Sequence, residues 1–150
     1  MSKKSHILKN KGYSWSEVER KEYKTETSNF KDIHRYTLLG DDIDALNFQT
    51  RYFEIQPGGY SSLEYHRHPH SVVIIRGSGT VVLGDSMQDI NMFDTVYIAP
   101  ETIHQFHADK DEPLGFICTV DRYRDRPRIP DDELIAEKIE SEEILKKIKK

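Results

Sequence analysis

The sequence predicts an all-β fold, a small barrel or sandwich with a polar arm before it and a helix after it. Residues 33–120 are rich in Val, Ile, Phe and Tyr, and turn-forming residues divide them at short intervals. Residues 1–32 are polar, and residues 121–150 begin as an Arg- and Pro-rich segment and continue in a helical pattern. Many short strands between turns are typical of a sandwich or barrel. A chain of 150 residues fits one domain.

The N-terminal arm, residues 1–32, has Trp15 and several tyrosines as its expected anchors to the rest of the domain. We expect one short helix in it, around residues 16–23.

The middle zone, residues 33–120, is predicted to form eight strands. Pro, Gly, Asn and Asp favour turns because they supply the backbone angles that turns need. Such residues separate the apolar segments, as at Pro57-Gly58-Gly59, Gly84-Asp85 and Ala99-Pro100. The expected strands lie near residues 33–39, 51–56, 63–66, 70–75, 79–83, 95–98, 105–108 and 114–120.

The apolar run Val72–Ile75 does not alternate with polar residues. Such a run is typical of a strand buried on both faces. One face would line the barrel, and the other would meet a second sheet or another subunit.

The C-terminal segment is predicted to be a helix that packs on the outside of the barrel. Pro130 is followed by three acidic residues, and the chain ends in a lysine-rich turn, which is the favourable order for a helix dipole. Between these ends an apolar stripe runs from Leu134 to Ile148.

Composition excludes several classes of protein. Charged residues make up 32% of the chain, and the net charge is −4, so the strongly basic face of a nucleic-acid-binding protein is not expected. Val72–Ile75 is far too short to cross a membrane, and we see no apolar segment typical of a signal peptide. The single cysteine, Cys118, cannot form an internal disulfide, so we expect a cytoplasmic location.

One stretch of twenty residues, Gly58–Gly77, suggests a metal site. It has the spacing G-x5-E-x-H-x3-H-x6-G, and a further histidine, His104, follows on a later strand. Glu64 and His66 have the same parity and point to one face of a strand, and His70 can face them from the next strand. One carboxylate and three imidazoles suit a divalent metal ion. We expect one ion per chain, with Mn or Fe favoured and Zn, Ni or Co as alternatives.

His68 offers a second interpretation of the same stretch. With His66 it forms another H-x-H pair, but that choice places Val72 where an acidic ligand is expected. We therefore favour Glu64, His66, His70 and His104 as the ligands. His68 is then expected to be a turn residue or a group that orients a metal-bound imidazole.

At these residues the chain resembles the cupins. The first cupin motif, G-x5-H-x-H-x3–4-E-x6-G, aligns with Gly58–Gly77 without gaps, with Glu64 at the first His position and His70 at the Glu position. The second motif keeps its ligand, His104, but Phe93, Ala99, Glu101 and Ala108 replace its usual Gly, Pro, Gly and Asn. The resemblance covers about residues 48–120. It implies a double-stranded β-helix, the jelly-roll barrel of cupins, with a metal in its mouth.

A narrower resemblance involves residues 50–54, 59–64, 113–118 and 121–127. These segments look like those of a group of short bacterial and archaeal cupins. Some members of that group are similar to a manganese-dependent cupin that eliminates methanethiol from a methylthio-xylulose phosphate.

Other residues suggest chemistry near the metal. Cys118 shares parity with Leu114 and Phe116, so it is either a small buried apolar residue or a thiol group beside the metal, and we take it as a candidate catalytic residue. The arginines at 122, 124, 126 and 128 alternate with acidic residues and are expected to be solvated. Any of them, or Arg51 or Arg76, is also a candidate for binding a phosphate or carboxylate.

Three functions suit these features. The first is a metal-dependent lyase or isomerase that acts on a small hydroxy-ketone or sugar phosphate, with Glu54, His68 or Cys118 as the proton-transferring group. The second is a dioxygenase of an enol substrate, and the third is a non-catalytic small-molecule sensor. The expected partners are a small-molecule substrate and a second copy of the chain in a homodimer, without nucleic acid or membrane.

Overall fold

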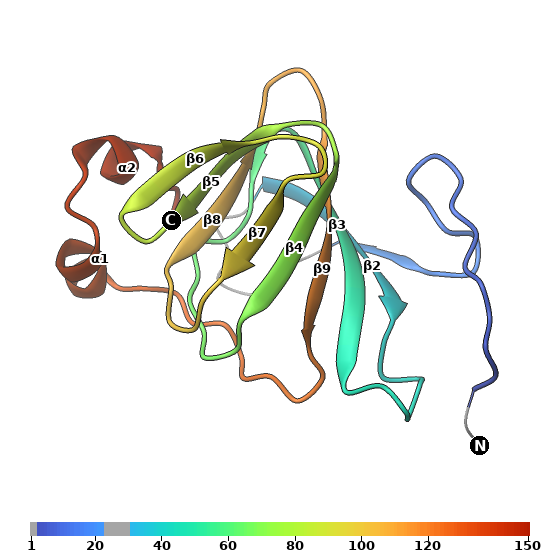
Figure 1. Ribbon diagram of the computed structural model, residues 1–150. Helices are drawn as coiled ribbons and strands as arrows, with labels where there is room; N and C mark the ends of the chain where they lie inside the picture. Colours follow the sequence, from blue (N-terminus) through green and yellow to red (C-terminus); the bar gives the residue numbers. More distant parts are fainter. Residues whose placement is uncertain (1–2, 23–30) are drawn as a thin grey trace.

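The computed structural model describes residues 3–22 and 31–150, and it shows a curled antiparallel β-sheet with two short helices at its C-terminal end (Figure 1). The all-β prediction is therefore confirmed. The strands are β1 (Arg20–Glu22), β2 (Lys31–Leu39), β3 (Phe48–Tyr60), β4 (His70–Arg76), β5 (Gly79–Leu83), β6 (Ser86–Ile90), β7 (Thr95–Ile98), β8 (His104–Ala108) and β9 (Leu114–Asp121). The helices are α1 (Asp132–Lys138) and α2 (Glu142–Lys147).

The strands form two layers that face each other across the core. In one layer β3 lies between β2 and β9, and β4 and β7 follow beyond β9, whereas β6, β5 and β8 form the other layer. β3 joins the two, because its last residue, Tyr60, pairs with His107 of β8. The main core lies between the layers and includes Phe53, Phe106 and Phe116, whose rings stack.

The predicted turn at Pro57-Gly58-Gly59 is wrong, because β3 continues through it. Gly58 has φ +71°, a backbone conformation that residues with a side chain adopt at a cost, and its N–H donates to the carbonyl of Asp109 at 2.8 Å. This glycine lets the strand bend from one layer toward the other while its backbone remains hydrogen-bonded.

The predicted strand at residues 63–66 is also wrong. Glu64 and Tyr65 each form an isolated bridge, Glu64 with His104 and Tyr65 with Arg128. The segment therefore crosses between two different partners and runs beside neither long enough to become a strand. β6 was missed, since its polar sequence after Gly84-Asp85 lacks an apolar alternation.

The N-terminal arm packs on the outer face of the β2–β3 pair. The predicted helix around residues 16–23 is wrong for its described part, which turns after Trp15 and forms β1; Tyr23 lies outside the described residues. Trp15 is buried against the rings of Tyr36 and Tyr52, at centroid distances of 5.4 and 5.2 Å. The prediction that Trp15 anchors the arm is confirmed.

The arm also explains much of the apolar run Val72–Ile75. Val72 and Ile74 are fully buried in the main core, whereas Ile75 points outward and packs against the cluster that contains Trp15. Val73 is half-buried. The second face of β4 is therefore covered in part by the same chain.

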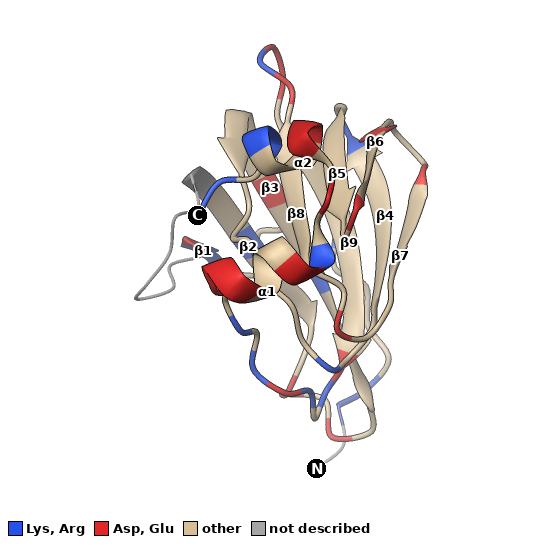
Figure 2. Ribbon diagram, turned by 90° about the vertical axis from the view of Figure 1, so that its left-hand side faces the viewer, with Lys and Arg blue, Asp and Glu red and all other residues tan. Residues whose placement is uncertain are grey.

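The predicted C-terminal helix is divided into two. Asp85, in the turn between β5 and β6, accepts hydrogen bonds from the backbone N–H groups of Glu140 and Ser141 at 3.0 and 2.9 Å. Ser141 then caps α2, and each helix has acidic residues at its start and lysine at its end (Figure 2). Both helices pack on the outer side of β5 and β8 through Ile135, Ile139 and Ile144, next to Val82. In the described part of the chain, neither helix has the length or the apolar character needed to span a membrane.

Candidate metal centre

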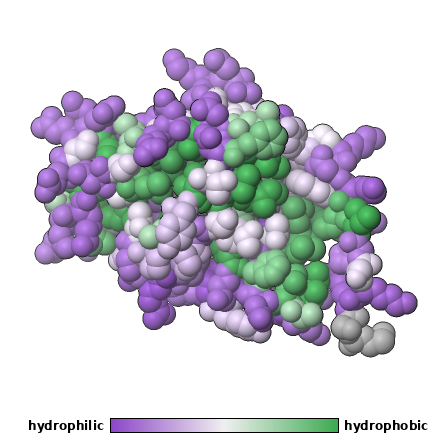
Figure 3. Space-filling model, viewed as in Figure 1, coloured by the Kyte–Doolittle hydropathy of each residue, from purple (hydrophilic) through white to green (hydrophobic). Residues whose placement is uncertain are grey.

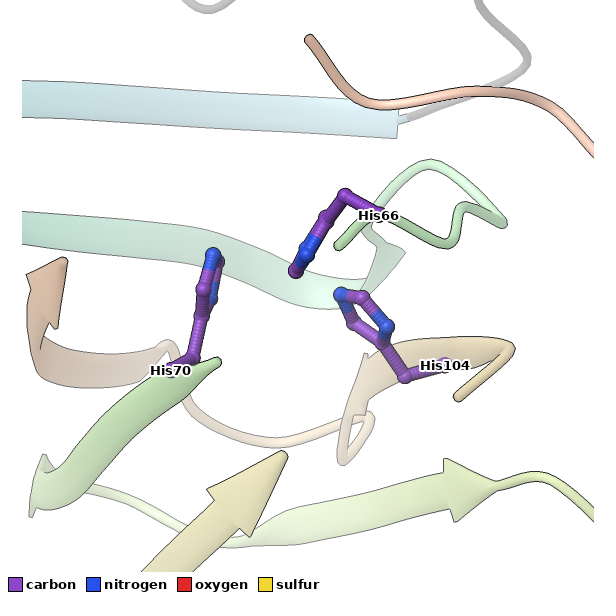
Figure 4. A group of neighbouring side chains, drawn as sticks. All are labelled: His66, His70 and His104. Carbon is purple, nitrogen blue, oxygen red and sulfur yellow. The ribbon is translucent and has the colours of Figure 1, made fainter. Parts of the chain in front are cut away.

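Three histidines from different parts of the fold meet at one end of the barrel. His66 lies in the loop between β3 and β4, His70 begins β4, and His104 begins β8. Their side chains point toward one another, and one ring nitrogen of each lies within 4.8 Å of those of the others (Figure 4). His66 and His104 are 1% and 3% exposed. The structure thus brings together the three predicted imidazole ligands.

In His66 and His104, hydrogen bonds engage one ring nitrogen and leave the other available to bind a cation. Nδ1 of His66 lies 2.7 Å from the carbonyl of His68, and Nδ1 of His104 lies 2.8 Å from that of Thr102. A carbonyl only accepts, so in each case Nδ1 carries the hydrogen and Nε2 keeps its lone pair. Nε2 of His66 is buried and has no hydrogen-bond partner among the described residues. Because an unpaired buried acceptor is costly, this donor set fits a divalent metal ion.

The electrostatic environment favours the ligand form of these side chains. Burial lowers the pKa of His66 to about 4, with the neighbouring histidines adding to the effect, and burial lowers the pKa of His104 to about 4. The pKa of His70 is also well below its ordinary value, chiefly through burial. All three are therefore neutral at pH 7, which is the state that binds metal.

Two further groups lie next to this trio. Oε1 of Glu64 lies 3.7 Å from Nε2 of His104, and its other oxygen accepts a hydrogen bond from Ser62. Nε2 of His68 lies 3.0 Å from Nε2 of His70. Burial raises the pKa of Glu64, which a bound cation would oppose. The structure therefore places both alternatives of the sequence analysis within reach of the trio.

Asp125 holds the histidine loop, residues 61–69 between β3 and β4, a role that the sequence did not predict. Its carboxylate accepts hydrogen bonds from the backbone N–H groups of Arg67 and His68 and lies 2.8 Å from Nδ1 of His68. Although burial alone would raise the pKa of Asp125, these hydrogen bonds hold it below its usual range. Asp125 thereby fixes the histidine loop and directs Nε2 of His68 toward His70. Nothing in the local sequence signals a contact between residues 57 or 58 positions apart.

Cys118 lies beside the trio, inside the barrel. Its Sγ is 3.5 Å from Nδ1 of His70 and 3.5 Å from Nη2 of Arg51. Burial raises the pKa of the Cys118 thiol, and the charge of Arg51 opposes that effect only in part. Cys118 therefore keeps its proton at neutral pH. The cavity next to it is lined by His70, His104, Glu64, His68, Arg51, Arg124 and several apolar side chains.

Other candidate residues lie away from this cavity. Glu54 and Arg76 pair with each other on the outer face of the barrel, at 2.8 Å, so Glu54 is not positioned to transfer protons in the cavity. Arg122 donates to the backbone carbonyls of residues 41–46, and Arg128 pairs with Glu101. Arg122 and Arg128 are thus held by other parts of the chain and not by the acids that alternate with them.

Comparison with known proteins supports the same fold. A model of the cupin domain family matches residues 51–120. A protein of Rhodospirillum rubrum named 1-methylthio-D-xylulose 5-phosphate methylsulfurylase is 38% identical over 125 residues, which are 83% of this chain and 79% of that protein.

Two solved structures agree closely with this one. A cupin 2 conserved barrel domain protein from Rhodopseudomonas palustris has a TM-score of 0.85 and 39% identity, covering 96% of this chain and 98% of that chain. A cupin-2 domain protein from Rhodospirillum rubrum has a TM-score of 0.78 and 36% identity, covering 88% of each chain. The cupin resemblance noted in the sequence is therefore confirmed.

Proposed function

The chain belongs to the cupin domain family, and from this membership we propose that it is a metal-dependent enzyme. The observation that carries the proposal is the convergence of His66, His70 and His104, with a buried unpaired nitrogen on His66. The reaction we propose is a lyase or isomerase reaction on a small polar substrate that chelates the metal.

We propose that His66, His70 and His104 hold the ion and that Glu64 is the fourth ligand. A buried carboxylate offsets part of the charge of a divalent cation, and Glu64 already stands next to His104. His68, fixed by Asp125, then orients His70. Mn or Fe is favoured, and Zn, Ni and Co also suit nitrogen and oxygen ligands. When bound, such an ion would supply Lewis-acid polarisation of a carbonyl group and would offset negative charge that develops on the substrate.

The proposed substrate is a hydroxy-ketone or a sugar phosphate. The name of the Rhodospirillum rubrum relative gives a methylthio-xylulose phosphate, a ketose with a hydroxyl group beside its carbonyl. Such a pair of oxygens would be able to bind a divalent ion held by these residues. The cavity adds apolar walls, Ile33, Phe53, Phe106 and Phe116, suited to the carbon skeleton.

Cys118 is proposed to exchange a proton with the reacting substrate. Its sulfur accepts a hydrogen bond from Arg51 and faces Nδ1 of His70, while burial keeps the thiol protonated. Cys118 lines the cavity, so its S–H group is within reach of a molecule bound there. A protonated group next to the reacting carbon can act as a general acid.

Metal analysis and a substrate panel test this proposal. Protein purified without chelators is expected to contain about one divalent ion per chain. The panel comprises hydroxy-ketones, sugar phosphates and methylthio-sugar phosphates, each with the Mn, Fe(II), Co, Ni and Zn forms. Activity that survives complete metal removal would overturn the proposal. Oxygen consumption during turnover would instead support a dioxygenase.

A homodimer is also proposed. Apolar side chains cover much of the middle of the face shown in Figure 3, and Met92, Phe93 and Tyr97 are 51%, 75% and 68% exposed. Tyr97 lies on β7, which ends one side of the sheet path. An apolar edge strand favours association with another copy. Light scattering is expected to give twice the mass of one chain, whereas a Tyr97→Lys variant should shift the protein toward the monomer.

A further inference from the structure

An arginine that forms no ion pair with a described carboxylate lies inside the barrel. Arg51 is on β3 and has the same parity as Phe53 and Ile55, which are part of the main core. Arg51 is 6% exposed, and its Nε has no hydrogen-bond partner among the described residues. Its guanidinium lies 5.0 Å from the centre of the Phe53 ring, and Nη2 donates to Cys118. In the described part of the chain, no carboxylate forms an ion pair with it.

A second guanidinium lines the same cavity. Nη1 of Arg124 donates to the side-chain oxygen of Gln49 at 3.0 Å and to the carbonyl of Asp121 at 3.2 Å. Gln49 is buried, and its amide nitrogen is bound by Asp41. The partners of Arg124 are therefore neutral acceptors. Burial lowers the pKa of Arg124, and the charge of Arg51 lowers it further, while the charge of Asp41 opposes both effects only in part.

Such an arrangement is costly in a protein that has no use for it. Taking one ion out of water costs several kcal/mol, and two cations that share a cavity repel each other. Glu64 lines the cavity too; burial raises the pKa of its carboxyl group, and the charge of Arg51 opposes that effect. This carboxylate accepts from Ser62 and stands next to His104, and it forms no ion pair with Arg51. One carboxylate does not balance two guanidiniums, so further negative charge is expected to come from a ligand.

We propose that Arg51, assisted by Arg124, binds the phosphate group of the substrate. The inference rests on the proposed function, because Cys118 lies between Arg51 and His70, 3.5 Å from each, so that the cation pair and the histidine trio share one cavity. A phosphate dianion carries two negative charges and several acceptor oxygens, so it suits two guanidiniums better than a ligand with one carboxylate does. Arg51 thus sets which small ketone the site accepts: one that carries a phosphate.

Inorganic phosphate is the probe that tests this site. It is titrated into the full-length chain in the zinc-loaded form and after chelator treatment, and heat of binding and metal content are measured on the same samples. The wild-type chain is expected to bind phosphate in both forms, and acetate at least about 10-fold more weakly. Equal binding of acetate would overturn the assignment to phosphate.

Three variants locate the binding. Arg51→Met is expected to weaken phosphate binding at least about 10-fold while metal content is unchanged, and Arg51→Lys less, because lysine keeps the charge without the planar pair of donors. Arg126→Met, an exposed arginine of the segment that contains Arg124, is the matched control and should have no effect. Equal phosphate binding by the wild type and Arg51→Met would overturn the inference.

The wild-type chain provides a test even if these variants fail to fold. The Nε–H nuclear magnetic resonance signal of Arg51 is expected to shift as phosphate is added, and a signal that stays unchanged at saturation would overturn the inference. Failure of the proposed function can be distinguished from failure of this inference. A chain that binds phosphate through Arg51 but never retains metal would overturn the metal-dependent enzyme and uphold the phosphate site.

Discussion

Two arginines of the barrel wall have opposite surroundings. Arg76 points outward, where Nη1 donates to Glu54 at 2.8 Å and the guanidinium lies 4.5 Å from the centre of the Tyr13 ring. The same Glu54 oxygen also accepts the hydroxyl of the fully buried Tyr52. Arg51 points inward, where Nη2 donates to the sulfur of Cys118 and Nε has no hydrogen-bond partner among the described residues.

The two surroundings indicate different roles: the outer arginine stabilises the fold, and the inner arginine is available for a ligand. The outer group of Arg76, Glu54 and Tyr52 satisfies its own charges and hydrogen bonds, so it stabilises the packing of the arm without needing a ligand. Within the described part of the chain, the cavity instead contains an unpaired nitrogen on His66 and another on Arg51. Unsatisfied buried groups destabilise the folded chain, and a site that retains them is expected to recover that energy on binding.

The largest effect is expected for His104→Ala. Removing this ligand from the trio should weaken metal binding by more than about 100-fold, since even groups behind a ligand contribute 10–100-fold. Metal content after dialysis against a metal buffer measures the effect. His6→Ala, at an exposed position of the arm, is the control and should retain the metal. A His104→Ala protein with full metal content would show that the cavity is not the metal site.

The second largest effect is a difference in metal affinity between variants of Glu64 and His68. Glu64→Gln is expected to weaken metal binding about 100-fold, and His68→Ala about 10-fold, because we place Glu64 on the metal and His68 behind His70. The two variants are compared by competition with a chelator of known affinity. A larger loss in His68→Ala would make His68 the fourth ligand and Glu64 a neighbouring carboxylate.

Much of the fold could be predicted from the sequence because it depends on local patterns. Apolar segments divided by turns predicted most of the strands, and Trp15 was recognised as the anchor of the arm. The errors arise where a distant residue decides the local structure. Asp85 divides the C-terminal helix through hydrogen bonds from residues 55 and 56 positions away. The carbonyl of Asp109 accepts a hydrogen bond from the N–H of Gly58, so that β3 continues through the expected turn.

The candidate site was predicted to a similar extent. Motif spacing identified the residues that converge, His66, His70 and His104, together with the neighbouring Glu64. Spacing could not distinguish the inward Arg51 from the outward Arg76, because the inner face of each strand depends on how the two layers pair. Asp125 was missed for the same reason, as its contact with the histidine loop forms only in the folded chain.

Acid is expected to destabilise the metal-free protein through the cavity histidines. His66 and His104 have a pKa of about 4 in the folded chain, below the ordinary value of 6.5. The unfolded chain therefore binds more protons between pH 6.5 and 4, and stability is lost as the pH falls through that window. At pH 5 each histidine should cost on the order of 2 kcal/mol relative to pH 7 or above. Urea unfolding of the chelator-treated chain measures this. If the free energy of unfolding of His104→Ala depended on pH as strongly as that of the wild type, the low pKa of His104 would be contradicted.

The two arginines give a direct test of the comparison. Arg76→Met is expected to lower the free energy of unfolding by about 2 kcal/mol, because Glu54 loses its cation and Tyr13 its cation–π contact. Arg51→Met should leave it unchanged or raise it, because an unpaired buried charge is removed. Urea unfolding without phosphate, at neutral pH, compares the two. Equal destabilisation by both substitutions would mean that Arg51 is a structural residue like Arg76.

The smallest effect is expected for Cys118→Ser, which tests whether the inner face takes part in proton transfer. Serine keeps a hydroxyl near Arg51 and His70, so metal content should not change and stability should fall by no more than about 1 kcal/mol. A hydroxyl is a much weaker acid than a thiol, and kcat should therefore fall about 10-fold if Cys118 supplies a proton. Turnover with the metal form and substrate that give the highest wild-type activity measures this, with Cys118→Ala beside it. Activity equal to the wild type in both variants would leave the metal mechanism intact and make Cys118 a packing residue between the histidine trio and the arginine pair.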